Sequence, residues 1–416
     1  MSRRKRVLSA LAIAVGMLIF SYLVTNQCLA ISGETVVMRK VELVRGWFQP
    51  HINPMADSVL LINVAYDKEQ VIKRDAYNEP MGYDAITDRE KLYQLLSELK
   101  HKDDSLLKTE HRGFYKYVLL DVIFADDIRT PQDSALFSLI TSMKRIVIPN
   151  DINTSLADTC LYAKAGPANY FTNYKFVSFT KFPYLYYGQK SLPLKMYEEL
   201  TGHRVNDHSL FLTDDGRLAR RSIVLPFELR CDSALTADGE KVWLNMGADL
   251  LGSTYTYSGD TITGYRDLYD YPELTQDKYI VIGAFSGGDM HYSYMENQPG
   301  SAILFNAYLS LLHGHHIVSP WFFVLLLAVF YVMAYLILGN QTIDAFLTDI
   351  IPHGNYAITT FTRVIIFIVS WVGYSLLLSI LCIFTYLVMG EVYDIFITAT
   401  VFQLISMATR LINKKR

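Results

Sequence analysis

Acidic residues that follow apolar, strand-like runs are the side chains of this sequence best suited to chemistry. Ligands of parallel α/β sheets bind outside the carboxyl ends of the strands, so these side chains are expected along one edge, an acidic rim. Carboxylates gathered there would hold a cation or a polar, amine-bearing ligand, although aspartates at such places also cap helices and end strands. The candidate ligand-binding residues are Asp67, Asp121, Asp126, Asp127, Ser286 and Asp289, with Asp151 after a further strand.

Two of these candidates have a second interpretation. Asp121 lies within an apolar strand, where a carboxylate is costly unless it is paired, so it is either a structural group or a ligand contact. Ser286 lies in a Gly-rich turn, Gly283 to Asp289, that matches neither a dinucleotide fingerprint nor a P-loop. Ala284 stands where a nucleophile elbow needs its first glycine, so Ser286 is not predicted to be catalytic. We therefore expect no cofactor and no enzyme activity.

Three histidines, His313, His315 and His316, cluster before an apolar run and offer ligands to a transition metal. Their spacing at a helix end does not place all three on one side. We therefore interpret them as a polar collar at the membrane surface and predict no metal site.

Strands apolar on both faces alternate with amphipathic helices in the first part of the chain. This alternation is typical of a parallel sheet covered by helices, so the fold class is α/β with a largely parallel central sheet. A helix from Asp88 is expected to begin with a capping box of Thr87 and Glu90. A second helix is expected to begin at Thr130, with Pro131 at its first position. The strands are expected at 58–65, 117–124 and 145–149.

The later part of the chain contains a hairpin signal and then a return to the parallel pattern. The Asp214-Asp215-Gly216-Arg217 step lies between two β-prone runs and predicts a hairpin. A strand at 279–282 and a helix at 302–313 follow.

Charged residues are absent from four stretches, 7–33, 297–343, 364–390 and 395–409, which explains why only 19% of the chain is charged. About 20 apolar residues in a helix cross the roughly 30 Å of a bilayer core. The sequence predicts four transmembrane helices, one N-terminal and three C-terminal. None carries an ionisable residue at mid-depth, so a transporter is not expected.

Basic residues at both ends predict the orientation, because loops rich in Lys and Arg stay in the cytoplasm. Both termini are then cytoplasmic, and a large domain lies outside.

Two cysteines of that domain, Cys160 and Cys231, either form a disulfide or are two free thiols. The expected segments are 1–27 (basic N-terminus and first helix), 28–319 (extracytoplasmic domain), 320–338 (second helix), 339–362 (cytoplasmic amphipathic loop), 363–390 (third helix) and 391–416 (fourth helix and basic tail).

The order of these motifs resembles the type-2 CHASE family, the cyclase/histidine-kinase-associated sensory extracellular domains. The resemblance covers about residues 40 to 320 together with the one-plus-three arrangement of helices. It implies a bacterial extracytoplasmic sensor joined to a cytoplasmic output domain, but only residues 413–416 follow the last span, so no output domain is expected in this chain. The resemblance rests on residues 59–64, 118–124 with Asp133, 215–217, 279–284, Pro299-Gly300 and Asn306-Ala307.

These observations favour a protein of the bacterial inner membrane that binds an extracytoplasmic ligand or protein. It would signal through its helices to a separate cytoplasmic or membrane partner. The protein could also form a homodimer. The 38 basic residues nearly balance the 41 acidic ones, so nucleic acid is not an expected partner. The alternatives are a membrane-tethered metal-assisted hydrolase that uses the acidic rim, and an envelope scaffold without a small ligand.

Overall fold

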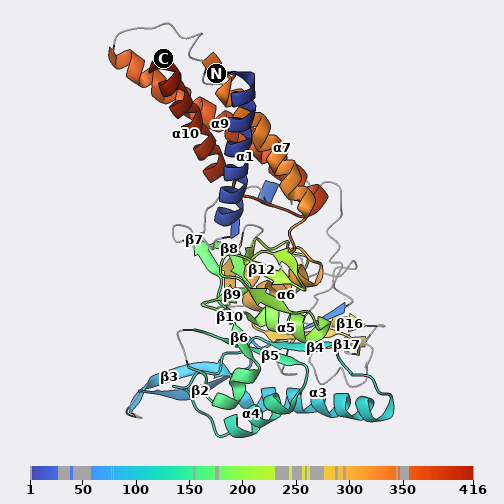
Figure 1. The fold of residues 1–416 in the computed structure, drawn as a ribbon. Helices are drawn as coiled ribbons and strands as arrows, with labels where there is room; N and C mark the ends of the chain where they lie inside the picture. Colours follow the sequence, from blue (N-terminus) through green and yellow to red (C-terminus); the bar gives the residue numbers. More distant parts are fainter. Residues whose placement is uncertain are drawn as a thin grey trace. The chain divides into compact units, whose positions relative to one another are not determined.

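The chain folds into two compact units (Figure 1). The helical unit comprises Met1–Arg45, His208–Val224 and Ile317–Arg416, and the sheet unit comprises Gly46–Asp207 and Leu225–His316. The computed structural model describes residues 2–26, 38–40, 58–75, 77, 79–152, 155–173, 178–229, 243–245, 255–257, 260–262, 276–285, 289–293, 297–342, 345–346 and 356–415.

A six-stranded sheet forms the centre of the sheet unit, and every neighbouring pair of its strands is parallel. The prediction of a parallel sheet is confirmed. Strand β18, which is the last of these six strands in the chain, lies between β1 and β4, so chain order does not give spatial order. From one edge to the other the strands are β15 (Trp243–Asn245), β1 (Val59–Asn63), β18 (Tyr279–Gly283), β4 (Tyr117–Leu120), β5 (Ile146–Asn150) and β6 (Ala165–Pro167).

Helices cover this sheet because its strands are apolar on both faces. Leu60 and Ile62 of β1 join the core cluster that includes residues of α3 and α4. Leu61 lies between them in the strand and points to the opposite face, since side chains alternate along a strand. The helices of the unit are α3 (Arg89–Thr109), α4 (Asp133–Ser142), α5 (Leu192–Thr201) and α6 (Gly300–Leu312), with the 3-10 helix η2 (Thr159–Ala163).

Both predicted helix starts require correction. Helix α3 is capped by Asp88 and not by Thr87, because the amide of Lys91 donates to the Asp88 carboxylate at 3.0 Å. Helix α4 begins at Asp133, whose carboxylate accepts from the Thr130 amide at 2.9 Å. At α3 an aspartate carboxylate is a better acceptor for amides than the threonine hydroxyl. At α4 Thr130 is itself the donor, because its amide and its hydroxyl both donate to Asp133.

Two predicted strands are shorter than expected, β1, which spans Val59–Asn63, and β4. Strand β4 ends at Leu120, so that Asp121 lies at its carboxyl end and not inside it. Short antiparallel ladders complete the sheet unit. They are β2 (Lys68–Arg74) with β3 (Pro80–Thr87), β7 (Phe171–Asn173) with β8 (Ser178–Pro183), β9 (Leu185–Tyr186) with β10 (Gln189–Lys190), β16 (Tyr255–Tyr257) with β17 (Asp260–Ile262), and β19 (Met290–Tyr292) with β20 (Asn297–Pro299), while β11 (Val205–Asp207) is a further short strand.

The helical unit contains four helices long and apolar enough to cross a membrane. The prediction of one N-terminal and three C-terminal spans is confirmed at this level. Residues 343–344 and 347–355 of the amphipathic loop predicted at 339–362 lie outside the described residues, and α9 already begins at Tyr356. The helices are α1 (Arg3–Asn26), α7 (Pro320–Leu338), α9 (Tyr356–Met389) and α10 (Ile395–Lys415).

The two chain ends lie at the same end of the helical unit (Figure 1). Arg6 at the start of α1 donates from Nε to the carbonyl of Tyr335 at 2.9 Å, and its guanidinium lies 3.9 Å from the Tyr335 ring centroid. A cation is favourable at the end of α7, because the carbonyls of the last helical turn carry partial negative charge. This contact joins α1 to α7.

A hairpin from the middle of the sequence belongs to the helical unit. Strands β12 (Leu212–Asp214) and β13 (Arg217–Ala219) are antiparallel, which confirms the predicted hairpin. Asp215 and Gly216 have φ of 45° and 80°, as a tight two-residue turn requires. Residues just before α7 pair with it, since the amide of Val318 donates to the Leu218 carbonyl at 2.9 Å. A further short strand, β14, spans Ser222–Ile223.

Candidate functional site

Three neighbouring strands of the sheet bring polar groups together at their carboxyl ends. Asn63 of β1 is level with Gly283 of β18, and the amide of Asp121 donates to the Ile282 carbonyl at 2.7 Å. Asn63 is fully buried, and its Oδ1 accepts from the Phe285 amide at 3.0 Å. This hydrogen bond fixes the start of the loop that leads to Asp289.

An open pocket of about 340 Å³ lies at the carboxyl ends of β4, β5 and β6. This volume is within the range of small-molecule sites in proteins. Gly300 and Leu304 of α6 form one wall. The other lining residues are Asp121, Ile123, Pro149, Asn150, Asp151, Ala168, Asn169, Tyr170, Asp289 and His291.

A chain of polar contacts crosses the pocket. The Asp289 Oδ1 and the His291 Nε2 are 3.0 Å apart, and the His291 Nδ1 contacts the Tyr170 hydroxyl. Gly300 admits the Asp289 carboxylate, because a Cβ at Gly300 would lie 2.8 Å from its Oδ2. The first turn of α6 therefore faces a carboxylate, the arrangement that the helix dipole favours.

Asp121 has an unusual proton affinity. Burial raises its pKa, the neighbouring Asp289 carboxylate raises it further, and Ser301 and His291 lower it, with a result of about 7. Burial and the same two carboxylates also raise the pKa of Tyr170. At neutral pH Asp121 is thus close to half-protonated, whereas the Tyr170 hydroxyl keeps its proton. The pocket offers hydrogen-bond acceptors and negative charge, and it holds no deprotonated phenol.

The structure separates the other predicted rim residues from this pocket. Asp67 is buried and forms an ion pair with Lys91 at 2.7 Å. Asp126 is exposed, and Asp127 pairs with Lys73 of β2 at 3.1 Å. Ser286 lies outside the described part of the chain. Among the six candidates, Asp121 and Asp289 are the two that the structure brings together.

Sequence reasoning missed several residues of the pocket, namely Tyr170, His291, Asn150 and Asn169. Tyr170 and Asn169 follow β6, which is only three residues long and carries no strand-length apolar run. The nearness of His291 to Asp289 in the sequence was the one available signal. Asp151, which was expected at a strand end, does line the pocket.

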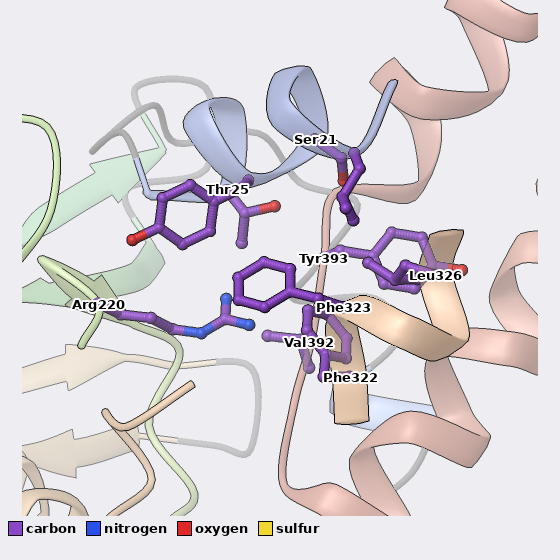
Figure 2. A pocket seen from close by; sticks show the side chains of 10 residues that line it. Ser21, Thr25, Arg220, Phe322, Phe323, Leu326, Val392 and Tyr393 are labelled. Atoms are coloured by element: carbon purple, nitrogen blue, oxygen red, sulfur yellow. The ribbon is translucent and has the colours of Figure 1, made fainter. Parts of the chain in front are cut away.

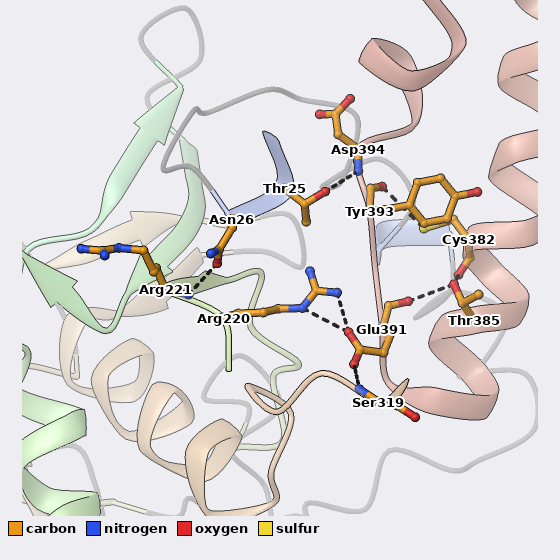
Figure 3. Close-up of polar contacts among 10 residues, drawn as sticks. All are labelled: Thr25, Asn26, Arg220, Arg221, Ser319, Cys382, Thr385, Glu391, Tyr393 and Asp394. Atoms are coloured by element: carbon orange, nitrogen blue, oxygen red, sulfur yellow. Dashed lines mark hydrogen bonds and ion pairs between the residues drawn. The ribbon is translucent and has the colours of Figure 1, made fainter. Parts of the chain in front are cut away.

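A second polar cluster lies within the helical unit and centres on a buried ion pair. The side chains of Arg220 and Glu391 are 5% and 2% exposed, and the Arg220 Nε lies 3.1 Å from the Glu391 Oε2. The other carboxylate oxygen accepts from the Ser319 amide at 2.9 Å (Figure 3). The pair therefore joins the hairpin segment, the start of α7 and the turn between α9 and α10.

The end of α1 joins the same cluster through two neutral contacts. The Asn26 Oδ1 accepts from the Arg221 amide at 2.7 Å, and the Thr25 Oγ1 accepts from the Asp394 amide at 3.1 Å (Figure 3). Beside the ion pair is a small hollow of about 10 Å³ (Figure 2). It is lined by Leu18, Ser21, Tyr22, Thr25, Arg220, Phe322, Phe323, Leu326, Val392 and Tyr393.

The raised pKa of Asp121 predicts a pH-dependent stability. A carboxyl with a pKa of about 7 in the folded chain, against 3.8 ordinarily, contributes most below about pH 4. That contribution is lost as the pH rises through about 7, so Asp121→Asn should stabilise the chain at about pH 8 by roughly 2 to 4 kcal/mol relative to its effect at about pH 4. Thermal unfolding of the purified chain measures the difference. The exposed Asp126→Asn is the control, and a pH-independent effect of Asp121→Asn would contradict the assignment.

The buried ion pair predicts strong coupling between two distant residues. Arg220→Met or Glu391→Leu leaves a buried charge without its partner and should destabilise the helical unit by about 3 to 5 kcal/mol. The double variant Arg220→Met with Glu391→Leu should be closer to wild type than either single variant, because it buries no charge. Thermal unfolding in detergent tests this, with the exposed Arg217→Met as the matched control. Additive losses in the double variant would refute the pairing.

Comparison of the chain with protein-family models, curated protein sequences and solved structures found no match. The resemblance to type-2 CHASE domains stays a prediction. The function of the pocket is therefore inferred from its own residues.

Proposed function

We propose that this protein is a membrane-anchored sensor whose sheet unit binds a small cationic or amine-bearing ligand. The observation that carries the proposal is the strand-end pocket, in which Asp121 and Asp289 meet at the first turn of α6. Binding would take place outside the cytoplasm of a bacterium. The membrane helices would pass the bound state to a separate partner on the inner side.

The charge of the pocket supports a cation as the ligand. The Asp289 carboxylate raises the pKa of Asp121, and a bound ammonium group would remove this repulsion. The ligand then favours the ionised form of Asp121 and lowers its pKa. Binding should therefore be tighter above pH 7 than below it and should release a proton at neutral pH.

The membrane arrangement supports an external sheet unit. The described residues include four candidate spans, and the chain ends of the helical unit lie together (Figure 1). Four basic residues occur at 3–6 and four more at 410–416. By the positive-inside rule both ends belong in the cytoplasm. An even number of spans agrees with that orientation, and so does the resemblance to type-2 CHASE proteins.

The chain path supports transmission from the pocket to the helices. Helix α6 lines the pocket at Gly300, ends at Leu312 and is followed in the chain by α7 from Pro320. Between them, Ser319 donates its amide to Glu391 in the turn before α10. A shift of α6 on ligand binding would thus pull on a connector that is hydrogen-bonded to the membrane helices.

The alternative of a metal-assisted hydrolase needs the whole acidic rim at one place. Asp126 is exposed and Asp127 pairs with Lys73, and neither lines the pocket. No observation therefore favours the hydrolase over the sensor. A scaffold without a small ligand would have no use for the open, acidic pocket.

The ligand class is tested with amine probes. Putrescine, ethanolamine, choline, glycine and lysine are titrated into the purified chain, and binding is followed by calorimetry. At least one should bind in the wild type, and Asp121→Asn and Asp289→Asn should each weaken it about 10- to 100-fold, the effect of losing a hydrogen bond to a charged group.

Asp126→Asn is the matched control, because it removes the same charge from a rim residue outside the pocket. Equal weakening in that variant, or no binding of any amine, would overturn the ligand assignment.

Transmission to a partner is measured in a separate experiment, in which a photo-crosslinking amino acid replaces Phe346, a side chain that is 66% exposed. Capture of a partner should change with ligand in the wild type and not in Asp289→Asn; an unchanged yield in both would count against transmission alone.

The external location predicts the reactivity of one native cysteine. Cys160 is exposed in the sheet unit. With Cys28, Cys231 and Cys382 changed to serine, a membrane-impermeant maleimide should label Cys160 in intact bacterial cells (spheroplasts if the outer membrane blocks the reagent). A second variant that also carries Cys160→Ser and Ser2→Cys should react only after the membrane is permeabilised. The reverse pattern would place the sheet unit inside.

A further inference from the structure

A second polar site lies in the sheet unit at the opposite end of α6 from the pocket. The His313 Nδ1 lies 2.9 Å from the Glu228 carboxylate, and the His315 Nε2 lies 3.4 Å from it. The three ligand atoms all lie within 4.8 Å of one another. Two histidines and a glutamate, from two segments of the chain, therefore converge on one point.

The end of α6 explains why His313 and His315 meet. The amide of Gly314 donates to the Leu311 carbonyl at 3.0 Å, and that of His315 donates to the Ser310 carbonyl at 2.9 Å. This is a Schellman motif, and Gly314 supplies the positive φ of 73° that it needs. The reversal of the chain turns His315 back beside His313. Regular helical spacing, on which the sequence prediction of a simple polar collar relied, does not include this reversal.

His316 does not join this group. It is buried, and its ring packs against those of Tyr184 and Tyr197, with centroids 6.0 and 5.6 Å away. The sequence expectation that the three histidines do not share one side is thus correct for His316. The same expectation did not include the close approach of His313 and His315.

A buried asparagine holds Glu228 in place. The Asn306 Oδ1 accepts from the amides of Glu228 and Leu229, both at 2.9 Å, and its Nδ2 donates to the Leu229 carbonyl at 2.8 Å. Asn306 is itself on α6 and is completely buried. The same helix therefore fixes both the glutamate segment and the two histidines, so the site is held by rigid structure.

The position of Glu228 suits a cation. Its carboxylate is only 14% exposed and faces the imidazole nitrogens of His313 and His315. A metal ion between these three side chains would supply a positive charge to this carboxylate.

We propose that Glu228, His313 and His315 bind a divalent transition metal ion of the zinc class. Ligand atoms about 2.0 to 2.1 Å from a tetrahedral zinc ion are roughly 3.3 Å apart, and the two distances to Glu228 lie on either side of that value. His313 is 41% exposed, so its ring is able to adjust toward His315. Imidazole nitrogens favour zinc, nickel or copper over magnesium and calcium.

Metal titration of the full chain tests this site. The protein is purified in detergent with an affinity tag that contains no histidine, treated with a chelator, and titrated with Zn²⁺ or with Co²⁺ as a spectroscopic probe. We expect one Co²⁺ per chain with the visible absorption of a low-coordinate site. His313→Gln and His315→Gln should each weaken Zn²⁺ binding by at least about 100-fold, since loss of supporting groups alone costs 10- to 100-fold.

His101→Gln is the matched control, because it changes an exposed histidine of α3. It should leave affinity unchanged. Saturating Zn²⁺ should raise the unfolding temperature of the wild type and not that of His313→Gln, whose exposed side chain makes misfolding a poor explanation of lost binding. The absence of Zn²⁺ binding in the wild type, or an affinity equal to that of the wild type in both histidine variants, would overturn the metal site. Amine binding at Asp121 and Asp289 should be the same in His313→Gln and wild type, so that the two proposals fail independently.

Discussion

The buried ion pair between Arg220 and Glu391 is the constraint on which the helical unit depends. Removing two charges from water costs several kcal/mol per ion, and only complete pairing offsets that cost. The second oxygen of Glu391 accepts from the Ser319 amide, and the guanidinium lies 5.6 Å from the Phe322 ring centroid. One buried charge pair thus holds together the hairpin segment, the connector before α7 and the turn before α10. None of these three could move far without exposing or separating the pair.

This constraint gives a physical meaning to the interrupted sheet unit. Its chain leaves for the helical unit after Asp207, returns at Leu225 and leaves again after His316. The inserted segment carries Arg220, and the last exit leads to Ser319, so both connections end at the same carboxylate. The chain itself leads from α6 to Ser319, which donates its amide to Glu391. The proposed signalling would need a coupling of this kind between its ligand site and a second element with alternative arrangements.

The sequence predicts the helices and strands better than it predicts which of them contact each other. Continuous apolar runs and gaps in charge indicate buried strands and membrane helices, and an Asp-Gly step is sufficient to predict β12 and β13. Local patterns carry no information on long-range order, so the position of β18 between β1 and β4 was not predictable. The same holds for Arg220 and Glu391, which are 171 positions apart. The helix caps failed for a local reason: the Asp88 carboxylate accepts the Lys91 amide, and the Asp133 carboxylate accepts the amide of Thr130 itself.

The candidate site shows the same limit in its charges. The sequence correctly indicates that aspartates follow the strands, but it does not tell which of them a cation from another element neutralises. Lys91 of α3 reaches Asp67, and Lys73 of β2 reaches Asp127, so these carboxylates have a cationic partner within the chain. In the described part of the chain, Asp289 contacts His291, and Asp121 responds to Asp289 by a raised pKa. The strand-end pocket is therefore where two carboxylates of this sheet lie close together, with Lys68 as a positive charge that interacts with Asp289. A cation of the proposed kind would add to the charge that Lys68 supplies there.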